Sequence, residues 1–310
     1  MMYLDAPPRL IGTEVFSSMP DDYRRKGVRT DWADANRPGQ PTDCFIEGPS
    51  FDADGNLYIV DIPFGRIFRI APDGKWSLAA EYDGWPNGLK IGSDGRILVA
   101  DYMHGIMELD VHKGRVQPVL TARNSESFKG CNDLHIASNG DIYFTDQGQT
   151  GLHDPTGRVY RLARSGRLDC LIDTGVSPNG LVLDPTESVL FVAMTRDNAV
   201  WRAPFMKDGN VSKVGRFLFD LRPERSRWAD HGQGRPAVRG ARLARACVRV
   251  CAQWRVDRAH QILRWTKLHQ CRDRRQEPRP PLCDGISDGH GAGRGYQRSQ
   301  FVIAGSVSDD

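Results

Sequence analysis

A strand-and-turn unit occurs three times in the first half of the chain, and this repeat restricts the fold more than any other feature. The copies are SFDADGNLYIVD, KIGSDGRILVAD and HIASNGDIYFTD, with turn glycines at Gly55, Gly95 and Gly140. A fourth, weaker copy contains PTESVLFVA. Asp-Gly and Asn-Gly favour tight hairpin turns, and the apolar, β-branched runs that follow them are typical of buried strands.

A second predicted strand follows each unit at a regular offset. In the segments RIFRI (66–70) and RVYRL (158–162), apolar and basic residues alternate, which predicts one apolar face and one basic face. A repeat of about 40–48 residues with about four strands is typical of a β-propeller blade. We therefore predict an all-β propeller; a β-sandwich with accidental internal similarity is the alternative.

One position relative to these turns carries an oxygen-bearing side chain in all four units. Eight residues before each turn stand Glu47, Asn87, Asn132 and Asn179. Equivalent positions of a propeller lie on a ring around the central channel. Because this position precedes a predicted strand, we expect its side chains to face one mouth of that channel.

A ring of carboxylate and amide oxygens matches the preference of a hard cation. Calcium takes six to eight oxygen ligands at about 2.3–2.6 Å, whereas zinc prefers His or Cys. We predict Glu47, Asn132 and Asn179 as metal ligands, with Ca²⁺ as the best match and Zn²⁺, Mg²⁺ or Mn²⁺ as alternatives. For Asn87, a simple Pro-Asn-Gly turn is an equally good interpretation.

Four motifs resemble those of the senescence marker protein/regucalcin–gluconolactonase family. They are CFIEGPSFDADGNLYIVD, GWPNGLKI, CNDLHIASNGDIYFTD and SPNGLVLDP, and the resemblance covers about residues 14–221. It implies a six-bladed β-propeller, incomplete here with about four blades encoded, and a calcium-dependent lactonase. It also implies that Glu47 and Asn179 hold the metal and that Asn132 binds metal or substrate.

The chain departs from the family pattern at two places. The family uses an aspartate from a later blade, in a Pro-Asp-Gly motif, as a ligand and base, and no such motif follows Asn179. In the branches that open sugar lactones, an arginine often stands two residues before the position of Asn132, where this chain has Gly130. The first difference leaves the catalytic residue unknown, and the second weakens the case for a sugar substrate.

Residues of the channel wall are expected to select the substrate. We predict that Asn87, Trp85 and Tyr102 contact it together with Asn132. Phe144, which lies in a predicted buried strand, is predicted to belong to the core.

The composition of the chain changes after Leu221. From Arg222 onward there are 17 arginines but a single lysine, and four of the seven cysteines lie there. No strand or helix period is evident in that part until its last few residues. We therefore expect an N-terminal segment (1–40), propeller blades (41–221) and an Arg-rich, disordered tail (222–310).

A one-nucleotide slip of the reading frame near residues 221–224 accounts for this tail. Starting from the second base of each codon, Trp228 must become Gly because TGG is its only codon, and ERSRWADHGQGRP can then encode GPDGLTMDKDG. The restored Asp spans the codons of Arg227 and Trp228 and again lies eight residues before a turn glycine. We predict that the late-blade aspartate is lost at this point; the nucleotide sequence of the locus tests this.

A basic nucleic-acid-binding arm or a linker would also be rich in arginine. This segment, however, mixes Arg with Cys, Trp, His and Pro and has almost no Lys, so we expect no nucleic-acid partner. The Cys and His residues of the tail are poorly spaced for zinc: Cys247, Cys251, His260 and His269.

Cysteine usage and hydropathy bear on the compartment. Only Cys44, Cys131 and Cys170 occur up to Leu221, and an odd, sparse count favours reduced, buried thiols in the cytoplasm. No apolar run approaches the ~18–20 residues of a membrane span. The first residues lack a basic segment followed by an apolar run, so we expect neither a secretory signal nor a membrane partner.

The expected function is metal-dependent hydrolysis of a small lactone or ester, inactive or weak in this chain because the late-blade aspartate is missing. A non-catalytic interaction scaffold is one alternative. A related propeller esterase, phosphotriesterase or strictosidine-synthase-like enzyme is another, since a fold does not fix a function.

Overall fold

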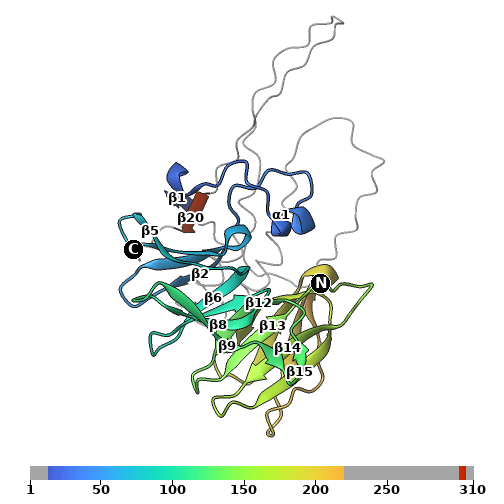
Figure 1. Cartoon of the computed structure of the whole chain (residues 1–310). Coiled ribbons are helices and arrows are strands. Elements are labelled where there is room, and N and C mark those ends of the chain that lie inside the picture. Colours follow the sequence, from blue (N-terminus) through green and yellow to red (C-terminus); the bar gives the residue numbers. More distant parts are fainter. Residues whose placement is uncertain (1–12, 220–299, 305–310) are drawn as a thin grey trace, which may run out of the picture.

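The computed structural model describes residues 13–219 and 300–304, and this part of the chain is built mainly of β-strands (Figure 1). Four four-stranded antiparallel sheets follow one another, and the strands within each sheet are in sequence order. These sheets are blades of a β-propeller. The prediction of an all-β propeller with about four encoded blades is confirmed.

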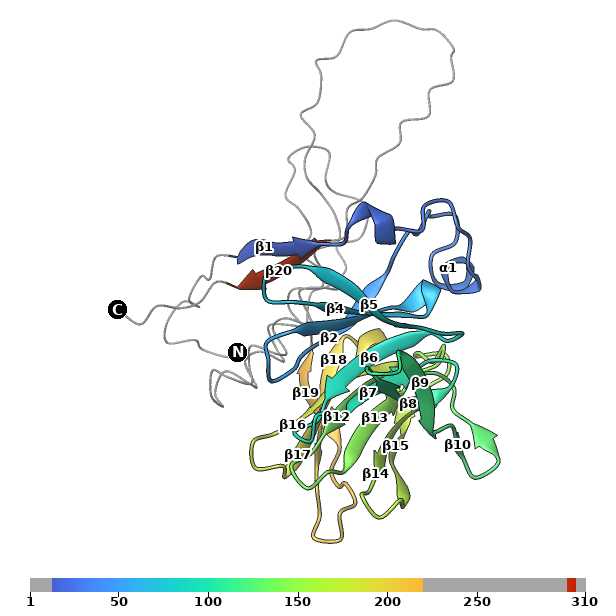
Figure 2. The same ribbon diagram turned by 60° about the vertical axis from the view of Figure 1, so that its left-hand side comes forward.

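The blades lie side by side around a common axis. Their strands are β2 (Ile46–Phe51), β3 (Leu57–Asp61), β4 (Arg66–Ile70) and β5 (Trp76–Glu81) in blade 1; β6 (Pro86–Ile91), β7 (Ile97–Asp101), β8 (Gly105–Asp110) and β9 (Arg115–Leu120) in blade 2; β12 (Cys131–Ile136), β13 (Ile142–Asp146), β14 (Gly157–Leu162) and β15 (Leu168–Gly175) in blade 3; and β16 (Pro178–Leu183), β17 (Val189–Met194), β18 (Ala199–Pro204) and β19 (Gly215–Phe219) in blade 4. The first strands contact one another in the order β2, β6, β12, β16 (Figure 2).

The other elements are short. They are β1 (Thr13–Ser18), the 3₁₀ helices η1 (Asp21–Tyr23), η2 (Ile62–Phe64) and η3 (Thr195–Asp197), the helix α1 (Asp31–Asn36), and the strands β10 (Ala122–Arg123), β11 (Glu126–Ser127) and β20 (Gln300–Ala304). β20 lies in the tail expected to be disordered, yet it is a strand that pairs antiparallel with β1. The predicted frame slip near residues 221–224 and the aspartate predicted to be lost at Arg227/Trp228 lie outside the described residues. Within the described ranges, no helix has the length and apolar character needed to cross a bilayer.

The hairpin turns have the backbone that the sequence predicts. Gly55, Gly95 and Gly140 have φ angles of 83°, 82° and 86°, a region that residues with a side chain rarely occupy. In the fourth turn the same place is taken by Glu187, with a φ of 54°. The repeat therefore marks the same hairpin in all four blades.

A blade is apolar on both faces where both are covered: blades 2 and 3 each lie between two blades, and blade 1 lies between blade 2 and the N-terminal segment. In β3, Tyr58 and Val60 belong to the core shared with blade 2, whereas Leu57 and Ile59 pack on the opposite side. Every residue of β3 is buried. Phe144, at 0% exposure, lies in the core between blades 2 and 3, as predicted.

The prediction that RIFRI and RVYRL each have one basic face is wrong. In β4, Ile67 packs on one side of the sheet and Phe68 on the other. Arg66 is only 3% exposed, because its guanidinium forms an ion pair with Asp61. The charged residue is tolerated in the interior because its carboxylate partner is buried with it.

The N-terminal segment covers the outer side of blade 1. Phe16, Met19 and Tyr23 pack against the core that contains Phe68 and Trp76. The indole Nε1 of Trp76 also donates a hydrogen bond of 2.8 Å to the hydroxyl of Ser17. The segment leading into the propeller thus shields a sheet face from water.

Glycines follow the oxygen-bearing position in blades 1 and 2, where neighbouring first strands approach closely. Gly48 has a φ of 56°, and a Cβ there would lie 2.7 Å from the Leu89 backbone nitrogen. A Cβ on Gly88 would lie 2.7 Å from the Asn132 carbonyl oxygen. No side chain fits at either place without moving the adjacent blade.

Replacing Gly48 by alanine should lower the free energy of unfolding by about 2–4 kcal/mol, because positive-φ strain and overpacking add. Gly95→Ala is the matched control, since Gly95 has a φ of 82° but no atom within 4 Å of the added Cβ. It should cost about 1–2 kcal/mol from strain alone. Urea unfolding of both variants measures the difference, and equal losses would contradict the close approach of the blades.

Candidate functional site

The position predicted to hold ligands lies within the first strand of each blade, not before it. Glu47, Asn87, Asn132 and Asn179 are each the second residue of β2, β6, β12 and β16. The pairing of each first strand with the second strand shifts at or just after this position. Such bulges bend the strand and re-aim a side chain. The Pro-Asn-Gly turn interpretation of Asn87 is therefore wrong.

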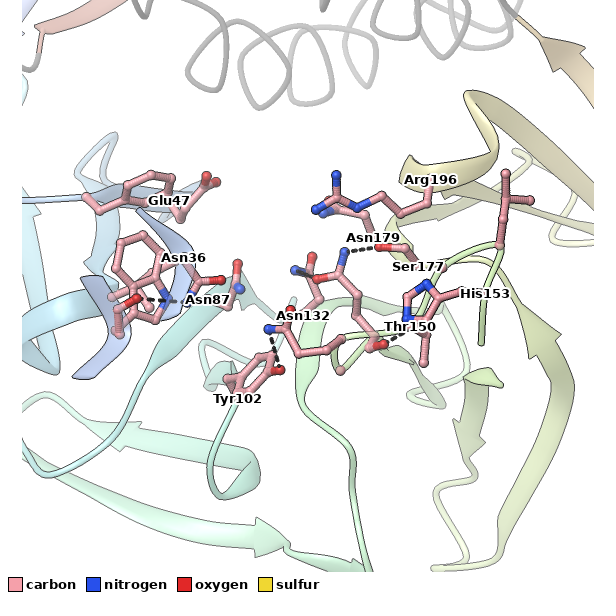
Figure 3. A pocket seen from close by; sticks show the side chains of 18 residues that line it. Asn36, Glu47, Asn87, Tyr102, Asn132, Thr150, His153, Ser177, Asn179 and Arg196 are labelled. Carbon is pink, nitrogen blue, oxygen red and sulfur yellow. Dashed lines mark hydrogen bonds between the residues drawn. The ribbon is translucent and has the colours of Figure 1, made fainter. Parts of the chain in front are cut away.

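All four side chains reach one pocket of about 660 Å³. Figure 3 shows Glu47 and Asn87 on one side of it, Asn132 near the centre and Asn179 on the opposite side. The apolar part of the lining comes from Trp32, Phe45 and Ile62. The structure thus brings the three predicted metal ligands together.

The oxygens of these residues are removed from solvent. Glu47 is 1% exposed and Asn132 is 4% exposed. The Oδ1 atoms of Asn132 and Asn179 are buried, and neither accepts a hydrogen bond from any residue that the structure describes. A buried carbonyl oxygen without a donor costs about 1–3 kcal/mol, so the two amides form a pair of acceptors that suits a cation or a ligand donor.

Gln147 fixes the orientation of the Asn132 amide. Asn132 Nδ2 donates to Gln147 Oε1 at 2.7 Å, which leaves Asn132 Oδ1 without this partner. Gln147 Nε2 in turn donates to Ser177 Oγ at 2.8 Å. Ser177 has a φ of 58° and stands two residues before Asn179. One glutamine therefore links the strands that carry two of the predicted ligands.

The last residue of the repeated motif is an aspartate, and in blades 1 and 3 its carboxylate accepts a hydrogen bond from the backbone just before the first strand. Asp61 accepts a hydrogen bond from the Phe45 nitrogen at 2.6 Å, and Asp146 accepts one from the Gly130 nitrogen at 2.8 Å. These nitrogens stand two residues before Glu47 and Asn132. Burial raises the pKa of Asp61 to about 6 and also raises the pKa of Asp146.

In blade 2 the equivalent aspartate holds the following turn instead. Asp101 accepts hydrogen bonds from the nitrogens of Met103 and His104, both at 2.8 Å. Its other oxygen accepts one from the Tyr82 hydroxyl at 2.7 Å. In this blade the aspartate therefore holds the loop that carries Tyr102, and not the segment that leads into the strand of Asn87.

A buried ion pair lies beside Asn132. Asp133 is 4% exposed, and Lys90 Nζ lies 3.2 Å from its Oδ1. Burial raises the pKa of Asp133, while the ammonium of Lys90 lowers it. Because Asp133 does not line the pocket, it stabilises the wall rather than facing a ligand.

Of the two aromatic residues predicted to contact the substrate, only Tyr102 lines the pocket. Tyr102 lines the pocket, and its hydroxyl accepts a hydrogen bond of 3.1 Å from Gln149. Trp85 does not line the pocket; its ring packs 5.7 Å from that of Tyr102. A Cβ on Gly130 would lie 2.4 Å from the Tyr102 ring. The ring therefore excludes a larger side chain from position 130.

The donor set is rich in amides and poor in carboxylates. Among residues 13–219 and 300–304, no three His, Cys, Asp or Glu side chains form a group that could hold a metal ion. The three cysteines among the described residues, the buried Cys44 and Cys131 and the half-buried Cys170, form no disulfide with one another. A cation in this pocket would depend on Glu47 and on amide oxygens, which suits calcium better than zinc.

Several pocket residues were missed from the sequence. The loop between β13 and β14 supplies Gln147 to His153, and blade 4 supplies Ser177 and Arg196. The available signal was the length of that loop, since ten residues separate Asp146 from Gly157 while three separate Asp101 from Gly105. A long loop at a channel mouth often carries functional residues.

Comparison with known proteins identifies the family. The model of the SMP-30/gluconolactonase/LRE-like region matches residues 45–236, which is 192 of the 310 residues. The chain belongs to this family. The match continues past Leu221, where the sequence analysis placed the end of the propeller.

A gluconolactonase and a lactonase are similar in sequence to this chain. A gluconolactonase from Zymomonas mobilis is 33% identical over 213 residues, covering 60% of this chain and 58% of the relative. Lactonase drp35 from Staphylococcus aureus is 30% identical over 173 residues, covering 53% and 52%. The chain thus spans between half and three fifths of these relatives.

A solved structure supports the fold. The gluconolactonase of Xanthomonas campestris superposes with a TM-score of 0.51 at 23% identity, over 67% of this chain and 75% of that one. Sequence identity at this level supports the propeller architecture but gives no information on the substrate.

Replacing Gln147 by leucine should lower the free energy of unfolding by about 1–3 kcal/mol, because the Asn132 amide and the Ser177 hydroxyl lose buried partners. Gln149→Leu is the control, since Gln149 is exposed and bonds only the rim residue Tyr102; it should cost about 0.5 kcal/mol or less. The side-chain amide protons of Asn132 in NMR spectra should exchange faster in Q147L alone. Unchanged exchange in Q147L would contradict the role of Gln147.

Proposed function

We propose that this protein is a divalent-cation-dependent lactone hydrolase and that Ca²⁺ is its cation. The observation that carries the proposal is the convergence of Glu47, Asn132 and Asn179 on one pocket, with two buried amide oxygens that accept no hydrogen bond from the described residues. Membership of the SMP-30/gluconolactonase/LRE-like family and the similarity to a gluconolactonase and a lactonase support it.

The residues divide into those that hold the ion and those that hold the substrate. Glu47 supplies the negative charge, and Asn179 supplies a neutral oxygen from the opposite side of the pocket. Asn132, oriented by Gln147, completes the ion's coordination or binds the substrate carbonyl region. Asn87 and Tyr102 line the adjacent wall, where a ring of small size would rest.

Hydrolysis of a lactone adds water to the ring carbonyl and breaks the ring C–O bond, which yields a hydroxy acid. A bound cation supplies polarisation of that carbonyl. A general base must take a proton from the water, and its pKa must suit the working pH. We expect this base to be the late-blade aspartate, which a frame slip near residues 221–224 would remove from the position of Arg227/Trp228. The chain with the printed sequence should therefore bind a cation but turn over lactones weakly.

We further propose that the protein works in the cytoplasm on small-molecule lactones. Cys44, Cys131 and Cys170 form no disulfide with one another, which is compatible with a reducing compartment. The polar pocket suits a small neutral or acidic ring better than a macromolecule.

Calcium at millimolar concentration should raise the melting temperature by several degrees, since a ligand of the folded state stabilises it by mass action. Glu47→Gln should abolish this shift and Asn179→Leu should reduce it. Glu126→Gln is the control, because Glu126 is exposed and its partner Arg158 lies outside the pocket. Differential scanning fluorimetry with Ca²⁺, Mg²⁺, Mn²⁺ and Zn²⁺ measures the shifts.

The absence of any cation-dependent shift in the wild-type chain would overturn the cation site. Hydrolysis of γ- and δ-lactones, followed by acid release, tests the reaction separately. Restoring the shifted frame over codons 222–310 should increase the rate by at least ~100-fold if the missing base is the cause, in line with typical general-base contributions.

A further inference from the structure

The wall of the pocket opposite Glu47 is built by the loop between β13 and β14, which is the longest of the four loops that join the second strand of a blade to the third, and by η3 of blade 4. Seven consecutive residues of the loop, Gln147 to His153, line the pocket, as does Arg196 from η3. This wall is the largest single contribution to the lining, so it has the greatest influence on which substrate fits.

The loop has a defined shape. Gly151 and Asp154 exchange two backbone hydrogen bonds of 3.0 and 3.1 Å. The Thr150 hydroxyl donates to the Gln147 carbonyl at 2.6 Å. These bonds join residues of the loop to one another and give its backbone a defined turn.

His153 and Arg196 both approach Gly151. The place where a Cβ of Gly151 would stand is 3.1 Å from His153 Nδ1 and 3.6 Å from Arg196 Cγ. Both side chains line the pocket and are exposed. Figure 3 shows Arg196 extending from this wall into the pocket. Two nitrogen-rich side chains are thus adjacent at the mouth.

No residue that the structure describes neutralises the charge of Arg196. Arg196 makes no hydrogen bond or ion pair with any residue that the structure describes. The neighbouring Asp197 is already engaged, since it accepts hydrogen bonds from Arg216 at 2.6 and 2.7 Å and from Trp201 at 2.8 Å. Among the described residues that line the pocket, Glu47 is the sole carboxylate, and it lies on the opposite side.

We propose that Arg196, with His153 beside it, binds a carboxylate substituent on the substrate, so that the preferred substrates are acidic lactones. This proposal rests on the proposed lactonase function. A guanidinium recognises a carboxylate through two parallel N–H···O bonds, and the imidazole adds a further donor. The substituent is a spectator: the ring carbonyl lies toward Glu47 and Asn132, and the carboxylate lies toward the loop.

The test uses a matched pair of probes, 5-oxotetrahydrofuran-2-carboxylate and its neutral primary amide. Wild-type protein with Ca²⁺ should show a KM at least ~10-fold lower for the carboxylate. Arg196→Gln should raise the KM for the carboxylate by about 10-fold to 100-fold and change that for the amide by less than 2-fold, with kcat nearly unchanged for both. Arg196→Lys should retain part of the preference, because it keeps the charge but not the bidentate geometry.

Arg202→Gln is the control, since Arg202 is an exposed arginine of the same blade that does not line the pocket. It should behave as wild type with both probes. Equal KM values for carboxylate and amide in the wild type, or an Arg202→Gln effect as large as that of Arg196→Gln, would overturn the anion subsite while leaving lactone hydrolysis in place.

A binding measurement separates this proposal from the proposed reaction. The ring-opened product 2-hydroxypentanedioate should bind the wild-type protein in calorimetry and bind Arg196→Gln at least ~10-fold more weakly. If such Arg196-dependent binding occurs and neither this chain nor the chain with the restored frame turns over any lactone, the lactonase proposal fails and the anion subsite stands. If the product and the acidic lactone both fail to bind, the subsite is refuted.

Discussion

The close approach of neighbouring first strands is the constraint on which the site depends. Beside the axis, Gly48 leaves room for the backbone of Leu89, and Gly88 leaves room for that of Asn132. A bulge at the same place bends each strand and aims the preceding side chain into the channel. The glycine and the bulge together place the polar side chains of successive blades in a ring around the channel. The hydrophobic core and the hairpin turns alone would not produce this arrangement.

The elements that the sequence predicts well are those set by local chemistry. Turn glycines and apolar runs determine the hairpins, and counting from the turns places Glu47, Asn132 and Asn179 in one pocket. Predictions failed where the position of a side chain depends on a partner on another element. Arg66 is buried because Asp61 is buried with it, so the alternation in β4 does not mark a solvent face. Trp85 packs against the core shared by blades 1 and 2 and does not line the pocket.

Gln147 and Arg196 could not be located from the sequence for a related reason. Their positions follow from the conformation of a long loop and from the packing of blade 3 against blade 4, neither of which has a periodic signature. Buried amide oxygens without donors break the rule that interior polar groups are paired. Such exceptions concentrate at functional sites, where a ligand completes what the protein leaves open.

The pairing of β1 with β20 joins segments from opposite ends of the sequence, Thr13 with Ala304. The blades consist of neighbours in sequence and can fold locally, whereas this pairing must close a loop of nearly the entire chain, at an entropic cost on the order of 5 kcal/mol. Contacts of such high sequence separation tend to form late during folding. The β1–β20 ribbon is therefore expected to close after the blades have assembled, and it cannot form before residues 300–304 have been synthesised.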